Sequence, residues 1–170
     1  MKYFLRRALF WSLVVTILAT CSYGIVAGPE QFSGYMFKAG LRTLDGTEVT
    51  DLTQVMSNDA VFLFVIYWQT GCPACEKQLD SLTKVAKIPG VAVIAINIGG
   101  SENSVRKVAD EYPFVFLVGA TSPPEAAAGV PQTALYGFNR DTNQWEEVYK
   151  WFGYNKEPVD SFLEVINAAE

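Results

Sequence analysis

Two cysteines separated by two residues, Cys72 and Cys75, are the residues of this chain best suited to chemistry. Thiols at this spacing can bind a metal, form a structural disulfide, or exchange disulfides with another molecule. A zinc site needs about four nitrogen or sulfur ligands, but the chain has no histidine and its third cysteine, Cys21, lies far away. A structural disulfide between residues this close would remove little entropy from the unfolded chain. The pattern therefore favours a redox-active dithiol without a metal or other cofactor.

The residues around the pair predict how it is positioned. Val61–Trp68 is a continuous apolar run rich in β-branched and aromatic residues, which predicts a strand buried on both faces. Cys72 falls at the N-cap of the next helix, where Pro73 suits the first position and residues 74–84 continue the helix. The positive end of the helix dipole should lower the pKa of Cys72 below the roughly 8.5 of a free cysteine. Cys75, one turn further on, is predicted to resolve a mixed disulfide.

The rest of the chain predicts an α/β domain. A small hairpin around Asp45-Gly46 and a helical turn over Val55–Asn58 precede the central strand. Strands are expected over Val91–Ile96, Phe114–Val118, Gln132–Phe138 and Trp145–Tyr149. Helices are expected from Glu102 or Asn103 to Tyr112 and from Glu157 or Val159 to Ala168, with an alanine-rich helical turn within Gly119–Ala128. These elements predict a mixed sheet flanked by helices.

Residues 1–28 differ from the rest in composition and are predicted to be a signal peptide or membrane anchor. Three basic residues within the first seven are followed by 21 uncharged residues, Ala8–Gly28. The positive-inside rule then places everything after Gly28 outside the cytoplasm. Cys21 follows Leu18-Ala19-Thr20 as in bacterial lipoprotein processing sites, so lipidation at Cys21, an uncleaved span and cleavage after Ala27 are alternatives.

The remaining chain divides into a linker, residues 29–36, and one domain, residues 37–170. All 18 acidic residues but only ten of the 13 basic ones follow Gly28, so this part carries a net charge of −8. Nucleic-acid-binding domains are basic. The charge balance therefore excludes nucleic acid as a partner.

Several of these segments recur together in a known family. Leu44-Asp45-Gly46, a strand ending in Tyr67-Trp68, Cys72-Pro73-Ala74-Cys75 followed by Glu76, and Gly129-Val130-Pro131-Gln132-Thr133 stand here in the order found in membrane-tethered thioredoxin-like proteins. The chain resembles the TlpA, ResA and DsbE kind over residues 37–168. The resemblance implies a thioredoxin-like fold.

The resemblance also assigns further site residues. It makes Pro131 the cis-proline that faces the dithiol, with the backbone of Val130 pairing with a bound polypeptide beside Pro73. Trp68 matches the tryptophan that shields the dithiol, although a core tryptophan without a functional role is an open alternative. Two positions depart from the family pattern. Ile66 replaces a buried acidic residue that accepts the resolving cysteine's proton, and Gln78 replaces a frequent glutamate.

The expected function is therefore that of an extracytoplasmic thiol-disulfide oxidoreductase in which Cys72 attacks and Cys75 resolves. The resemblance implies exported cysteine-containing proteins as substrates, including apocytochrome c, and a membrane thiol electron donor or acceptor. It favours the direction of a reductant, at the periplasmic or other outer face of the cytoplasmic membrane. One alternative is a non-catalytic module of an envelope assembly, secretion or conjugation machine. A copper carrier is disfavoured because such carriers of this fold add a histidine to the two cysteines, and the chain has none.

Overall fold

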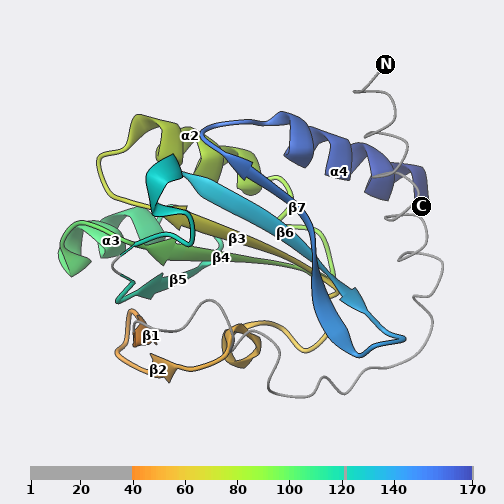
Figure 1. Cartoon of the computed structure of the whole chain (residues 1–170), viewed down its shortest axis with the longest axis horizontal. Coiled ribbons are helices and arrows are strands. Elements are labelled where there is room, and N and C mark those ends of the chain that lie inside the picture. Colours follow the sequence, from red (N-terminus) through yellow and green to blue (C-terminus); the bar gives the residue numbers. More distant parts are fainter. Residues whose placement is uncertain (1–39, 121, 170) are drawn as a thin grey trace.

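The computed structural model of the chain describes residues 40–120 and 122–169 (Figure 1). Its strands are β1 (Leu41–Thr43), β2 (Glu48–Val49), β3 (Phe62–Trp68), β4 (Val91–Asn97), β5 (Val115–Val118), β6 (Gln132–Asn139) and β7 (Gln144–Phe152). Its helices are α2 (Pro73–Leu82), α3 (Glu102–Ala109) and α4 (Glu157–Ala169), with 3₁₀ turns η1 (Leu52–Val55) and η2 (Ala126–Ala128). The predicted leader, the linker and Cys21 lie outside the described residues. Within them, no helix is long and apolar enough to cross a membrane.

The seven strands form one mixed sheet in the order β2-β1-β5-β4-β3-β6-β7. Strand β3 lies in its interior, parallel to β4 on one side and antiparallel to β6 on the other. All seven residues of β3 are buried, as its continuous apolar sequence predicts. The buried end of β3 at Trp68 therefore gives the chain that leads to Cys72 a fixed starting point.

Side chains of β3 alternate between the two faces of the sheet. Phe62, Phe64, Ile66 and Trp68 belong to the core cluster that also contains residues of α2, α3 and α4. Leu63, Val65 and Tyr67 belong to a second cluster, together with residues of β1, β2 and η1. Because β3, β4 and β5 are parallel neighbours joined by α2 and α3, right-handed crossovers place both helices on the same face. Figure 1 shows α2 and α4 together above the sheet and the β1–β2 pair at its lower edge.

The structure corrects the helical turn predicted over Val55–Asn58. The 3₁₀ turn spans Leu52–Val55 because Asp51 caps it, accepting a hydrogen bond from the N–H of Thr53 at 2.7 Å. Gln54 completes a capping box through Oε1, which accepts from the N–H of Asp51 at 3.3 Å. The Asp51-to-Gln54 spacing was the signal that the prediction overlooked.

Three elements end two or three residues away from the predicted position. Helix α2 ends at Leu82 rather than Lys84, and α3 ends at Ala109 rather than Tyr112. Strand β7 continues past Tyr149 to Phe152 because β6 pairs with it on both sides of a bulge at Leu135/Tyr136. The extra length brings Gly153 to Pro131, whose carbonyl oxygen accepts from the Gly153 N–H at 2.8 Å. The end of β7 is thereby fixed beside the loop that precedes β6.

Candidate active site

Cys72 occupies the N-cap of α2, as the sequence predicts. Its φ and ψ, −102° and 105°, are those of extended chain, and Pro73 takes the first helical position. The Cys72 sulfur accepts a hydrogen bond from the backbone N–H of Cys75 at 3.2 Å. This bond and the helix dipole both stabilise negative charge on the sulfur. The geometry therefore suits Cys72 as the thiolate that attacks.

Cys75 lies in a different environment from Cys72. The two sulfurs form a disulfide, with the Cα atoms 5.2 Å apart. Cys75 is 0% exposed and belongs to the core cluster below α2, whereas Cys72 is only half-buried. A buried thiol is hidden from a protein substrate, so only Cys72 can make the first attack.

No buried carboxylate accompanies Cys75 among the described residues. Ile66 is 0% exposed in the same apolar cluster, and the buried carboxylate of the described chain, Asp51, caps η1 instead. The carboxylates of α2, including Glu76 and Asp80, are exposed. Proton transfer from Cys75 therefore depends on water or on groups that reach the surface.

Asp80 is itself engaged at the surface of α2. It accepts a hydrogen bond from the hydroxyl of Tyr112 at 2.8 Å. Burial, followed by this hydrogen bond and the nearby carboxylates, raises the pKa of Tyr112 above that of a free tyrosine. The Tyr112 hydroxyl therefore stays protonated as a donor to Asp80.

Trp68 is fully buried in the core. Its side chain is 0% exposed and meets Phe116 edge to face, with ring centroids 5.6 Å apart. Trp68 shares its core cluster with Cys75, and Cys72 packs against the same cluster. The role of Trp68 as a shield for the dithiol stays a prediction.

Pro131 follows a cis peptide bond with Val130, as expected for this loop. The register of β6 against β3 pairs Gln132 with Tyr67, so Pro131 lies beside the carboxyl end of β3. Pro131 is buried and Val130 is half-buried, and Val130 packs against the same cluster as Cys72. The topology therefore brings the two predicted halves of the site, residues 72–75 and 130–131, to one end of the sheet.

Gln78 has a structural role that was not predicted. It is 0% exposed on α2, and its Oε1 accepts from Trp151 Nε1 at 3.3 Å and from the N–H of Asn155 at 3.0 Å. An amide oxygen can accept both bonds without taking up a proton. Gln78 thus connects the helix that carries the cysteines to the end of β7.

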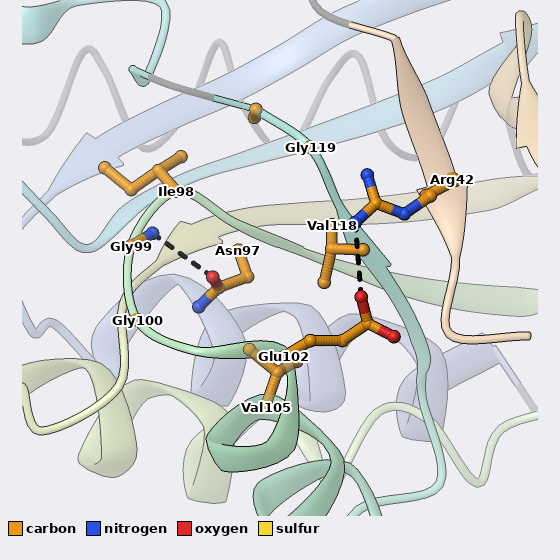
Figure 2. Close-up of a pocket in the computed structure, with 10 residues that line it drawn as sticks. Arg42, Asn97, Ile98, Gly99, Gly100, Glu102, Val105, Val118 and Gly119 are labelled. Atoms are coloured by element: carbon orange, nitrogen blue, oxygen red, sulfur yellow. Dashed lines mark hydrogen bonds and ion pairs between the residues drawn. The ribbon is translucent and has the colours of Figure 1, made fainter. Parts of the chain in front are cut away.

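A pocket lies at the carboxyl ends of β4 and β5 (Figure 2). It is next to residues 69–71, the turn between β3 and Cys72, which we call the dithiol turn. The residues that line it are Arg42, Asn97, Ile98, Gly99, Gly100, Glu102, Val105, Val118, Gly119 and Ala120. Two of these residues, Arg42 and Glu102, form an ion pair with 3.2 Å between nitrogen and oxygen. Neither cysteine lines the pocket, so it is not the redox site itself.

Comparison with known proteins finds relatives among the thiol-disulfide oxidoreductases. No protein-family model matches the chain. The chain is 25% identical over 124 residues to the thiol-disulfide oxidoreductase ResA of Halalkalibacterium halodurans, covering 66% of this chain and 69% of the relative. It is 30% identical over 59 residues to ResA of Geobacillus kaustophilus, covering 33% of this chain and 34% of that relative.

Solved structures agree on the fold. A secreted Mycobacterium tuberculosis disulfide oxidoreductase homologous to DsbE of E. coli matches with a TM-score of 0.53 and 19% identity, over 76% of this chain and 94% of that one. A thiol:disulfide interchange protein from Bacteroides sp. matches with a TM-score of 0.58 and 16% identity, over 86% and 91%. With a dithiol at the start of α2 and a thioredoxin-like fold, the chain is similar to thiol-disulfide oxidoreductases of the ResA kind.

Proposed function

We propose that this oxidoreductase works outside the cytoplasm, held at the membrane by residues 1–28, and reduces disulfides in exported proteins. The observation that carries the proposal is the asymmetry of the pair, with Cys72 half-buried at a helix N-cap and Cys75 fully buried. The leader sequence supports the location, and the likeness to ResA and DsbE supports the substrate class.

The reduction proceeds in two exchanges. In the first, the Cys72 thiolate attacks a substrate disulfide, forms a mixed disulfide and releases one substrate thiolate, which takes a proton from water. In the second, the Cys75 thiolate attacks the Cys72 sulfur, forms the Cys72–Cys75 disulfide and releases the other substrate thiolate. The substrate gains two electrons. A membrane dithiol then restores the reduced pair by the same two exchanges in reverse.

The loop before β6 is the proposed binding strip for the substrate chain. Among the described residues, the backbone N–H and C=O of Val130 have no hydrogen-bond partner. An extended peptide can pair with such free groups in the manner of an added strand. Val130, Pro131 and Pro73 would then align a substrate cysteine with Cys72.

Equilibration of the full-length protein in detergent against redox buffers of known potential tests this function. A reductant should have a potential near the roughly −270 mV of thioredoxin, whereas a value near −120 mV would assign the opposite direction. Turnover of a model protein disulfide should be measured in parallel. Absence of turnover with both cysteines intact would favour the non-catalytic envelope module.

The proposed location has its own test. An alkaline-phosphatase fusion after Glu170 should be active in a bacterial host, because that enzyme needs an oxidising compartment to form its disulfides. An inactive fusion that is nevertheless expressed at full length would place the domain in the cytoplasm and contradict this topology.

A further inference from the structure

The turn that leads into the dithiol rests on the loop that follows the neighbouring strand. Residues 69–71 connect β3 to Cys72, and residues 98–101 connect β4 to α3. The Ile98 N–H donates to the carbonyl of Trp68 at 2.9 Å, continuing the contact of the two strands into their loops. The two loops therefore leave the sheet side by side.

Thr70 makes the direct contact between these loops. Its backbone N–H donates to the carbonyl oxygen of Gly99 at 3.3 Å, and its Oγ1 lies 3.5 Å from the same oxygen. Gly99 is held in turn by Asn97, a residue only 4% exposed, whose Oδ1 accepts from the Gly99 N–H at 3.2 Å (Figure 2). A buried side chain at the end of β4 thus fixes the carbonyl on which Thr70 rests.

Gly100 is the residue that leaves room for this contact. Its φ of +106° disfavours any side chain, and a Cβ built there would run into Thr70 Oγ1 and lie 3.2 Å from Thr70 Cβ and 3.4 Å from Thr70 Cγ2. All three side-chain atoms of Thr70 are therefore close to the missing Cβ. A side chain at position 100 must push Thr70 out of its contact or move the whole turn.

We propose that Gly100 is a positioning residue for Cys72: by having no side chain, it lets Thr70 lock the turn that sets the direction of the Cys72 sulfur. Thr70 stands two residues before Cys72, and Gly71 between them is exposed with a φ of +73° and no atom within 4 Å of its missing Cβ. Among the described residues, Thr70 is thus the residue of the turn nearest to Cys72 that is hydrogen-bonded to the neighbouring loop. The sulfur keeps its bond to the N–H of Cys75 only while the turn stays in place.

Gly100→Ala should displace the turn and weaken the stabilisation of the Cys72 thiolate. This inference rests on Cys72 as the attacking thiol. The readout is the rate at which iodoacetamide alkylates Cys72 in the reduced full-length protein, measured against pH by mass spectrometry of the peptide that contains it. We expect the midpoint of the profile to move to higher pH and the rate at pH 7 to fall about 3- to 10-fold, since one unit of pKa is a tenfold change in thiolate.

Gly46→Ala is the matched control. Gly46 has a similar φ of +94°, but no atom lies within 4 Å of its missing Cβ. Both substitutions therefore strain the backbone alike, neither changes a charge, and only Gly100→Ala presses on the dithiol turn. Gly46→Ala should lower the melting temperature through backbone strain alone and leave the alkylation profile of Cys72 unchanged.

A second variant tests the route through Thr70. Thr70→Ala removes the two outer atoms from the crowded contact, so the double variant Gly100→Ala/Thr70→Ala should recover at least half of the lost alkylation rate. Equal profiles for Gly100→Ala and Gly46→Ala, or no recovery in the double variant, would overturn the inference. If Gly100→Ala does not fold, Thr70→Ala alone must still shift the profile to higher pH, by less than half of the shift expected for Gly100→Ala, since it removes the Oγ1 contact and keeps the backbone bond to Gly99. Loss of all disulfide exchange in the wild type would contradict the proposed function instead.

Discussion

The side-chain oxygen of Gln78 accepts a hydrogen bond from Trp151 Nε1 at 3.3 Å, which ties the dithiol helix α2 to strand β7. The same oxygen also accepts from the N–H of Asn155, where the chain turns toward α4. Both partners of the Gln78–Trp151 bond are buried. One neutral amide therefore satisfies two donors at the junction of three elements.

Replacing Gln78 by alanine should lower the free energy of unfolding by about 2–4 kcal/mol, because it leaves the buried Trp151 donor unpaired and opens a cavity beneath α2. Urea unfolding followed by tryptophan fluorescence measures the loss. Gln144→Ala, an exposed substitution in β7, should stay within about 0.5 kcal/mol of the wild type. Equal effects of the two substitutions would contradict the role of Gln78.

The two cysteines should fail in different ways when each is replaced by serine. Cys72→Ser removes the accessible thiol and should abolish exchange, whereas Cys75→Ser should leave Cys72 able to attack and to hold its partner as a mixed disulfide. Non-reducing electrophoresis detects the trapped species. Faster alkylation of Cys75 in the Cys72→Ser variant than of Cys72 in the Cys75→Ser variant would reverse the assigned roles.

A carboxylate introduced beside Cys75 should speed resolution of the mixed disulfide. Ile66 is fully buried in the cluster that contains Cys75, so Ile66→Asp places an ionisable group there and Ile66→Asn places a similar shape that cannot titrate. Both should destabilise the fold by about 1–3 kcal/mol. Stopped-flow release of a labelled partner should be about tenfold faster or more for the aspartate variant at neutral pH. Identical rates and pH profiles for the two variants would show that resolution is not limited by proton transfer.

Glu102 should make the free energy of unfolding decrease as the pH falls into the acid range. Hydrogen bonds from Arg106 and Arg42 lower the pKa of Glu102 in the folded chain, so its contribution is present above the unfolded pKa and is lost as the pH falls through the folded pKa. Glu102→Gln should therefore reduce stability at pH 7 and have no effect at an acid pH well below the folded pKa of Glu102. The difference at pH 7 should shrink in 1 M salt because the group is exposed.

Chemical denaturation of Glu102→Gln and the wild type at both pH values, with and without salt, measures this dependence. Glu164→Gln removes an exposed carboxylate of α4 and should change stability little at either pH. A stability loss for Glu102→Gln that persists in acid would mean that the ion pairs with arginine are not its cause.

The sequence predicted the parts of the molecule that depend on local pattern. The buried strand β3, the Cys72 cap and the Pro73 helix start are encoded by residues adjacent in the chain, so periodicity and capping rules suffice to predict them. The contacts of Gln78 with Trp151 and of Thr70 with the Gly99-Gly100 loop join residues far apart in sequence. Neither could be predicted, because the packing that brings such residues together is set by the assembled sheet. The pair Gly99-Gly100, two residues after the end of β4, was the one local sign of the second contact.

Strand β7 closes one side of the sheet, which has consequences for the protein at high concentration. An outer strand exposes a row of unpaired backbone groups to which a strand of another molecule can add. The aromatic side chains of Tyr149 and Phe152 on β7 are 44% and 42% exposed and would favour such an addition. The same strand also carries three charged residues, Glu146, Glu147 and Lys150. Lys150 is ion-paired to Glu147 and Glu125. These charges disfavour self-association through this strand. Neutralising them would therefore reduce solubility without changing the chemistry of the dithiol.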